Sequence, residues 1–388
     1  MTAIKRYIKG DRVVWGITFM LLLFSIPAVY SASAMISAKS QGDVHFLVRQ
    51  ISAVLLASIF VFLFSLINYK AYLAIIKLFY PIVIVMLLMT LFAGVSHNNA
   101  KRWIELPVVG IELQTSEIAK IALIIFVSAF LASKKNDDSI YKKNEQIAAI
   151  VFVVTVGLIF PADLSSALMI SAIIVLLMFV ASVRIKNIYI IILVALGLAV
   201  LYVLIAEAFN WPGRLSTWTH RIDVFFGNSQ TLSSDETYQA DIAKMAIVNG
   251  SFWGQGMGNG TVRYLLPQSH SDFIFAFILE EYGTWMGALI SILYLALLYR
   301  GIRIARKTNS LFAAYLALGL TFAIVLQAFI NIGVSVGALP VTGQTLPLIS
   351  MGRTSLLVTS FSLGIILNIS KSMEDPDDSF NTQEELET

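Results

Sequence analysis

Six uncharged, largely apolar runs limit the fold of this chain more than any other feature of its sequence. They cover residues 13–38, 50–69, 78–100, 146–162, 164–183 and 187–206. The hydrocarbon core of a bilayer is about 30 Å thick and takes roughly 20 apolar residues per helix, so each run predicts a membrane-spanning helix. Two more helices fit, at about 116–133 and 271–299, if a few charges are tolerated.

The segment 308–352 has no charge over 45 residues, which is too long for one span. Its middle is rich in Gly and Pro, which break helices. We therefore expect one helix at about 310–335, a break, and a last helix at about 346–370. The total predicts an all-α polytopic integral membrane protein with ten transmembrane helices.

The composition supports this class. Hydrophobic residues make up 57% of the chain and charged residues 13%, about half the roughly 25% of soluble proteins. The formal net charge of +3 excludes a nucleic-acid partner, which would need a concentrated basic face. The chain has no Cys, which excludes disulfides and thiolate chemistry, and its four His are too scattered for a transition-metal site.

The basic residues predict the orientation. In a ten-helix topology, 17 of the 27 Lys and Arg lie at the two termini and in the short loops of one side, which is therefore cytoplasmic. The loop at about 95–116 and a large loop between helices 7 and 8, at about 207–270, are then extracytoplasmic. We expect one domain over 1–371, with a retained first helix rather than a cleaved signal peptide. The acidic tail 372–388 is predicted to be disordered.

Two clusters of ionisable residues are candidate sites, because charge at membrane depth is costly. Glu117 and Lys120 are three residues apart on one helical face, where they can neutralise each other. An ion pair that only holds helices together is the alternative to a catalytic role.

The second cluster lies before the predicted helix 271–299. Ser271 or Asp272 could be its N-cap, and Asp272, next to His270, could instead be a general base at the membrane surface. Glu280 and Glu281 lie further along and cannot share one helical face, so at most one could face the same cavity as Asp272.

The long loops add two further patterns. Their basic residues could face a polyanionic lipid head group: Lys101, Arg102, Arg214, Arg221, Lys244 and Arg263. The glycine run 254–260 lacks the dinucleotide fingerprint, because Asn259 replaces the third glycine, and it is interpreted as a flexible backbone crossing near the membrane surface.

Six motifs in order resemble those of the SEDS family (shape, elongation, division and sporulation), which includes FtsW, RodA and SpoVE. They are Asn99–Ile104, Leu113–Lys120, Tyr238–Gln239 with Ala246–Gly256, Leu266–Ala276 with Glu280–Gly283, Gly337–Gly343 and Leu346–Ser350. The resemblance covers essentially the whole chain.

Some positions depart from the family pattern. Gln268 stands where the family usually has Glu, which argues against an essential carboxylate there. Ala162 to Ser166 keeps the family's Asp163 but loses its proline and glycine. Arg353 replaces a glycine and adds a cation near the outer end of the last helix.

The resemblance implies a peptidoglycan glycosyltransferase that polymerises lipid II, the undecaprenyl-pyrophosphate-linked disaccharide-pentapeptide, outside the cytoplasmic membrane. Transfer with inversion needs one base, for which Asp272 is the candidate. The candidate substrate-binding residues are Arg102, Lys101, Glu117, Lys120, Arg263 and His270. Cations among them would stabilise the pyrophosphate. No cofactor is required by the pattern, and a divalent cation such as Mg²⁺ or Mn²⁺ is left open.

Three alternatives stay open at this point. A lipid II flippase would use the same cavity but would need alternating access, and a scaffold would need no Asp272. Within the family, the loop segments 239–250 and 259–263 favour the division branch over the elongation branch. The implied partners are a class B penicillin-binding protein transpeptidase and other divisome membrane proteins, at the division septum of a bacterial cytoplasmic membrane.

Overall fold

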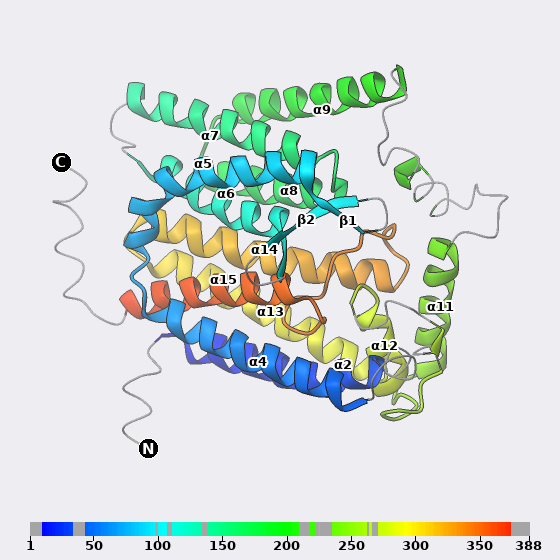
Figure 1. Cartoon of the computed structure of the whole chain (residues 1–388). Coiled ribbons are helices and arrows are strands. Elements are labelled where there is room, and N and C mark those ends of the chain that lie inside the picture. Colours follow the sequence, from blue (N-terminus) through cyan, green and yellow to red (C-terminus); the bar gives the residue numbers. More distant parts are fainter. Residues whose placement is uncertain are drawn as a thin grey trace.

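The structure is a computed structural model of the chain, and it is mostly helical (Figure 1). It describes residues 10–33, 43–97, 100–106, 111–133, 138–208, 217–219, 221, 225, 235–261, 264–265 and 271–373. The acidic residues 374–388 and part of the loop 207–270 lie outside the described residues, so the predictions made for them stay predictions.

Helices occupy every range in which a span was predicted. They are α2 (Arg12–Ala32), α4 (Asp43–Leu66), α5 (Lys70–Ala93), α6 (Thr115–Ala132), α7 (Asp138–Ile159), α8 (Leu164–Val180), α9 (Ile185–Ala208), α11 (Asp235–Gly250), α12 (Ile274–Tyr282), α13 (Thr284–Lys307), α14 (Leu311–Ser335) and α15 (Arg353–Ser372). Among the described residues, eight helices are long and apolar enough to cross a membrane. The multi-pass class is therefore confirmed, whereas the count of ten spans stays a prediction.

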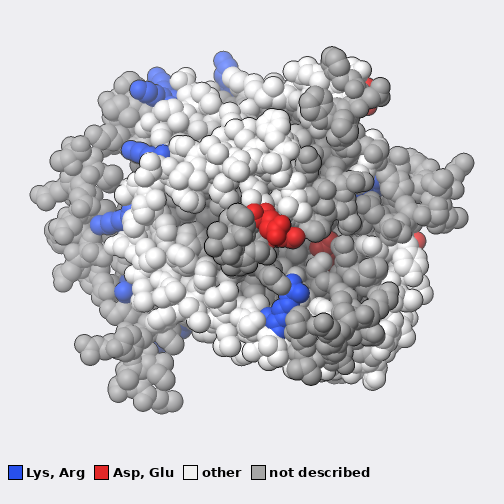
Figure 2. Space-filling model, viewed as in Figure 1, with Lys and Arg blue, Asp and Glu red and all other residues white. Residues whose placement is uncertain are grey.

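The bundle has a buried centre and a lipid-facing edge. The apolar windows of α6, α14 and α15 are 83%, 67% and 72% buried, whereas that of α9 is 6% buried. In Figure 1, α9 runs along one edge and α14 lies inside. Figure 2 shows a largely uncharged surface between the two ends of the bundle, with Lys and Arg gathered toward the end where the termini lie. This surface has the composition that lipid requires.

A small antiparallel sheet corrects the all-helical expectation. Its strands are β1 (Val95–His97), β2 (Ala100–Leu106) and β3 (Ile111–Gln114), in the order β1-β2-β3. The helix predicted over 78–100 ends at Ala93 because Gly94 is extended and β1 follows. Hydropathy alone could not show this end, since the apolar residues of a strand resemble those of a helix. Strand β3 leads directly into α6, so the sheet lies at one end of the central helix.

Two predicted helices have different bounds. The helix expected over 271–299 is α12 and α13, separated at Gly283, whose φ is +83°. A Cβ at Gly283 would lie 2.2 Å from the carbonyl oxygen of Phe252, so only glycine lets the two segments approach. The last helix begins at Arg353 rather than near residue 346. The residues between α14 and α15 form a non-helical segment, 336–352, named the connecting loop below.

Candidate functional site

The turn before α12 places Asp272. The Ser271 hydroxyl donates to Asp272 Oδ1 at 3.1 Å, and Asn331 Nδ2 donates to the Asp272 carbonyl oxygen at 2.8 Å. The predicted N-cap role is wrong: the N-cap position of α12 is Phe273, and no side chain caps the helix. The Asp272 carboxylate is therefore not used to begin the helix.

The surroundings of Asp272 change its affinity for protons. Burial raises the pKa of its carboxyl above the ordinary value and outweighs the other contributions. The hydrogen bond from Ser271 and the charges of Arg102 and Arg221 lower this pKa, whereas the charge of Asp163 raises it. A carboxylate with a raised pKa is a better proton acceptor, as a general base requires.

Arg102, in strand β2, contributes a positive charge to the surroundings of Asp272. Its Nη2 is 3.3 Å from Asp163 Oδ1, and its Nε donates to the Ala162 carbonyl oxygen at 3.2 Å. Gly343 lies between Arg102 and Asp272: a Cβ there would be 3.8 Å from Arg102 Nη1 and 3.6 Å from Asp272 Oδ2. Its φ of +72° also favours glycine. The structure thus brings Arg102 and Asp272 together around one backbone position.

Asp163 was noted from sequence only as a retained motif residue. It is buried at the N-cap of α8, where it accepts hydrogen bonds from the Ser166 amide at 3.2 Å and the Ser166 hydroxyl at 2.8 Å. Gln344 Nε2 donates to the same hydroxyl at 3.0 Å. Asp163 therefore pairs with Arg102, and the Ser166 hydroxyl, which Asp163 accepts from, joins α8 to the connecting loop.

The connecting loop and α14 hold the backbone of the turn that contains Ser271 and Asp272. Asn331 donates to the Gln344 carbonyl oxygen at 2.7 Å as well as to that of Asp272. Ser350 Oγ donates to the Ser271 carbonyl oxygen at 2.7 Å and accepts from the Leu346 amide at 2.8 Å. Sequence reasoning missed Asn331 and Gln344, and named Ser350 only as the end of a motif. The signal that could have found them is their amide and hydroxyl groups within the long charge-free stretch.

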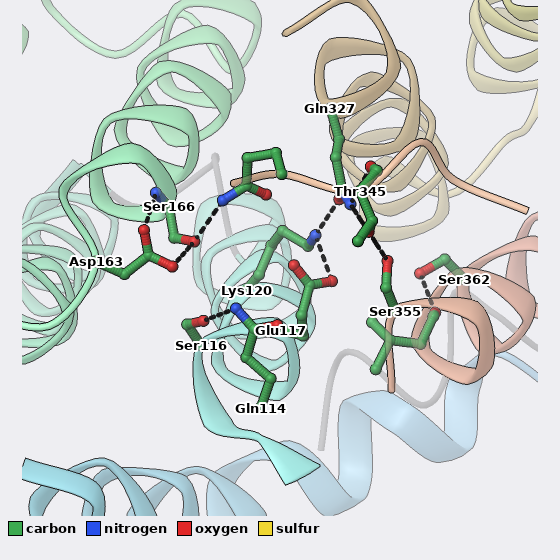
Figure 3. Close-up of polar contacts among 12 residues, drawn as sticks. Gln114, Ser116, Glu117, Lys120, Asp163, Ser166, Gln327, Thr345, Ser355 and Ser362 are labelled. Atoms are coloured by element: carbon green, nitrogen blue, oxygen red, sulfur yellow. Dashed lines mark hydrogen bonds and ion pairs between the residues drawn. The ribbon is translucent and has the colours of Figure 1, made fainter. Parts of the chain in front are cut away.

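The predicted Glu117–Lys120 pair is present, with Lys120 Nζ 2.8 Å from Glu117 Oε2 and both residues buried. Lys120 also donates to Gln327 Oε1 at 2.7 Å, and Gln327 Nε2 donates to the Thr345 carbonyl oxygen at 3.1 Å (Figure 3). The described side-chain contacts of Lys120 are thus with Glu117 and Gln327 rather than with Asp272. The pair is linked to the site through Thr345, the neighbour of Gln344.

A cavity opens beside Arg102 and Asp163. It is lined by Leu87, Thr90, Leu91, Arg102, Thr115, Ser116, Leu158, Ile159, Ala162 and Asp163. Its walls come from α5, β2, the first turn of α6, the end of α7 and the residues that follow α7. One end carries the Arg102–Asp163 pair, and much of the remaining wall is apolar.

Glu280 and Glu281 are both fully buried. Glu280 Oε1 accepts from the Thr261 amide and hydroxyl at 3.0 and 3.1 Å. Glu281 Oε1 accepts from the Ser31 hydroxyl at 2.7 Å and the Gly258 amide at 2.9 Å. The glycine run 254–260 therefore packs against these two carboxylates, and its interpretation as a flexible crossing stays a prediction.

Several predicted site residues cannot be placed. Arg263, His270 and Gln268 lie outside the described residues, as do the side chains of Lys101 in β2 and Arg353 in α15. In the part of the chain that the structure describes, no three His, Asp or Glu side chains group as a metal site. The divalent cation stays a prediction.

The comparisons agree with the fold. The profile of the FtsW/RodA/SpoVE family, described as a cell cycle protein, matches residues 11–375. A protein described as a probable peptidoglycan glycosyltransferase FtsW from Geobacter metallireducens is 31% identical over 379 residues, which is 96% of each chain. Stage V sporulation protein E of Bacillus subtilis is 31% identical over 93% of this chain and 97% of its own.

Solved structures show the same fold. The rod shape determining protein RodA of Thermus thermophilus matches with a TM-score of 0.68 at 20% identity, over 95% of this chain and 99% of its own. A chain from a structure titled as a peptidoglycan synthase complex that coordinates polymerization and crosslinking matches with a TM-score of 0.70 at 23% identity, over 94% and 98%.

The chain belongs to the FtsW/RodA/SpoVE family. The predicted enzyme class, peptidoglycan glycosyltransferase, and the predicted multi-pass location in the inner membrane are confirmed by the relatives together with the apolar helices.

Proposed function

We propose that this chain polymerises lipid II into glycan strands at the outer face of the cytoplasmic membrane, with Asp272 as the general base. The observation that supports this most is the position of Gly343, whose Cβ would contact both Asp272 Oδ2 and Arg102 Nη1. A proton acceptor and a cation thus face the same small space. Transfer from a pyrophosphate donor needs these two functions side by side.

The proposed reaction is a single displacement. The 4-hydroxyl oxygen of the acceptor sugar attacks the anomeric carbon of the donor, and its proton passes to Asp272. The bond between that carbon and the pyrophosphate oxygen breaks with inversion, and undecaprenyl pyrophosphate leaves with its electron pair. Arg102 stabilises the negative charge that develops on this leaving group, with Arg221 contributing at longer range.

The remaining predicted substrate residues receive supporting roles. Lys101, Arg263 and His270 are proposed to face the pyrophosphate or the sugars, from the sheet and from the loop before α12. Glu117 holds Lys120, and Lys120 supports the connecting loop through Gln327. This role for Lys120 fits its described contacts better than direct binding of the pyrophosphate. A divalent cation such as Mg²⁺ or Mn²⁺ could share the pyrophosphate with Arg102.

The proposed topology has ten spans, with both termini in the cytoplasm. The last turn of α13 holds the basic side chains of Arg306 and Lys307, as the orientation rule expects at a cytoplasmic end. The turn with Asp272 precedes α12 and α13, so it lies at the opposite, outer end. This is the face on which the lipid-linked disaccharide is polymerised.

We place the chain in septal synthesis, beside a class B penicillin-binding protein transpeptidase and other divisome membrane proteins. The support is the number of relatives that carry the name FtsW. An elongation-type role is the alternative within the family. A flippase is the alternative outside it, and it would not need a proton acceptor beside an arginine.

The Asp272→Asn variant tests the proposal. Asn keeps the size of the side chain and can still accept a hydrogen bond from Ser271, but it cannot take up a proton at neutral pH. Loss of a general base typically costs a factor of about 10²–10⁴ in rate. We therefore expect the purified variant to fold and to form almost no glycan from lipid II, measured as labelled polymer on a gel.

Asp241→Asn is the matched control, because Asp241 is an exposed carboxylate on α11 paired with Lys244. This control should polymerise at the parent rate. Normal glycan synthesis by a well-folded Asp272→Asn variant would contradict the role of Asp272 as the base. A parent protein that makes no glycan but moves lipid II between leaflets would favour the flippase.

A further inference from the structure

An uncharged, aromatic turn on the outer side has no part in the proposed chemistry. Residues 245–262 contain no charged side chain. Within them, Trp253 and Val248 are each 77% exposed, and Phe252, Met245 and Met257 are more than half exposed. Exposed apolar side chains gathered in one segment mark a contact with another apolar surface. We call residues 251–257 the aromatic turn.

Hydrogen bonds fix the aromatic turn to the start of a membrane-spanning helix. The Thr284 amide, at the first residue of α13, donates to the Ser251 carbonyl oxygen at 3.1 Å. Gly283 packs against the Phe252 carbonyl oxygen so closely that a Cβ would lie 2.2 Å from it. Figure 1 shows the segment that follows α11 at the same end of the bundle, beside α12.

The length of α13 sets the level of this turn in the membrane. Its 24 residues span about 36 Å, close to the roughly 30 Å hydrocarbon core plus a short margin. Arg306 and Lys307 lie at one end, and the aromatic turn lies at the other. Leu295 and Ile292 are exposed along the helix between these ends, as lipid-facing residues are. The turn therefore lies where the outer leaflet meets water.

The residue types suit this level. Trp and Tyr are enriched where a membrane meets water, because their rings are both apolar and polar. The rings of Phe252 and Trp253 pack edge to face, with centroids 5.1 Å apart, so they present one compact apolar surface. Trp285, in the first turn of α13, is also exposed.

We propose that the aromatic turn, with Met245 and Val248 of α11, inserts into the head-group region of the outer leaflet and anchors this part of the outer loop there. The occupant of the surface is the lipid bilayer. The absence of charge over 245–262 supports lipid, because insertion of a charged side chain would be costly.

The anchor has a consequence for catalysis, which rests on the function proposed above. The Gln255 and Gly256 amides donate to the carbonyl oxygens of Glu280 and Glu281, both at 2.9 Å. These glutamates belong to α12, which begins two residues after Asp272. The aromatic turn therefore sets the depth of the Asp272 carboxylate relative to the head groups, where the pyrophosphate of the donor lies.

Single cysteine variants test the insertion directly, because the chain has no Cys of its own. We would place an environment-sensitive fluorophore at Trp253→Cys, in lipid nanodiscs, and compare it with two controls. Glu105→Cys lies on an exposed position of β2, and Leu295→Cys lies on the exposed face of α13. Quenching is measured with iodide in the water and with nitroxide groups at the lipid head-group level.

We expect the label at 253 to be shielded from iodide and quenched by the head-group nitroxide. The label at 105 should be quenched by iodide. The label at 295 should be quenched less by iodide than the label at 105, and less by the head-group nitroxide than the label at 253. Equal quenching of the labels at 253 and 105 by iodide would overturn the proposal and would leave the aromatic turn as a surface for a protein partner.

A second measurement tests the link to catalysis. The double variant Phe252→Ser with Trp253→Ser should polymerise lipid II in nanodiscs several-fold more slowly than the parent, whereas Phe252→Leu with Trp253→Tyr should not. An unchanged rate in the serine variant would overturn this link even if the label at 253 is inserted. If the parent itself makes no glycan, the proposed function fails, and the quenching result still decides the anchor.

Discussion

At the scale of single residues, the site depends on charges that act on Asp272 from different sides. Arg102 lowers the pKa of this carboxyl and Asp163 raises it. Neither effect could be predicted from the sequence, because Arg102, Asp163 and Asp272 come from three distant segments. Removing one charge or the other should therefore shift the pH dependence of polymerisation in opposite directions.

A general base is active only when deprotonated, so activity falls as the pH drops through its pKa. Arg102→Gln removes a charge that lowers the pKa of Asp272, so the acid limb of the pH–rate profile should move to higher pH. Asp163→Asn removes a charge that raises this pKa, so the limb should move to lower pH. The measurement is the polymerisation rate against pH. Shifts of both variants in the same direction would show that Asp272 is not the titrating group.

Asn331 is expected to position Asp272 without touching substrate. Asn331→Ala removes the donor for the carbonyl oxygens of Asp272 and Gln344, and an unpaired buried acceptor costs about 1–3 kcal/mol. We expect kcat to fall with little change in KM for lipid II, because the turn loses its position rather than its charges. Ser291→Ala is the control, since the Ser291 hydroxyl donates only to Gly287 of its own helix. An equal loss in both variants would exclude a positioning role.

At the scale of elements, the buried pair on α6 joins three parts of the bundle. Lys120 contacts Glu117 on its own helix and Gln327 on α14, and Gln327 contacts the connecting loop at Thr345. The helices that surround the site are therefore coupled by one chain of hydrogen bonds. Figure 3 shows this chain running from α6 to Ser355 of α15.

Breaking this pair should disturb both folding and activity. Glu117→Ala leaves Lys120 without its carboxylate, and a buried charge that loses its partner typically costs 3–5 kcal/mol. We expect lower yield of folded protein and lower polymerisation. The double change Glu117→Lys with Lys120→Glu should recover only part of the yield, because a carboxylate at 120 would face Gln327 Oε1. Yield is measured by size-exclusion chromatography in detergent, and wild-type yield and activity of Glu117→Ala would refute the structural role.

At the scale of the whole molecule, the orientation in the membrane decides which leaflet supplies the substrate. A cysteine introduced at Ser233, in the large outer loop, should react with a membrane-impermeant thiol reagent in intact cells. A cysteine at Ser139, near the start of α7, should react only after the membrane is opened. The reverse pattern would place Asp272 on the cytoplasmic side and exclude polymerisation at the outer face.

The sequence by itself determined the membrane class, the approximate position of each long helix, the family and the Glu117–Lys120 pair. These features depend on local quantities: hydropathy over about 20 residues, motif order, and the spacing of three residues on one helical face. Each can be evaluated within a short segment, without knowing what the segment packs against.

Only the tertiary structure decided the sheet, the division of the eighth predicted helix at Gly283, and the contacts that hold the site residues together. Arg102 contacts Ala162, which is 60 residues away, and Ser350 contacts Ser271, which is 79 residues away. Gly283 separates α12 from α13 because residues 252–254 pack against it, and Asp272 is free of a capping role because Phe273 is the N-cap position of α12. Such contacts are set by the packing of helices around a common core, and no local pattern contains that information.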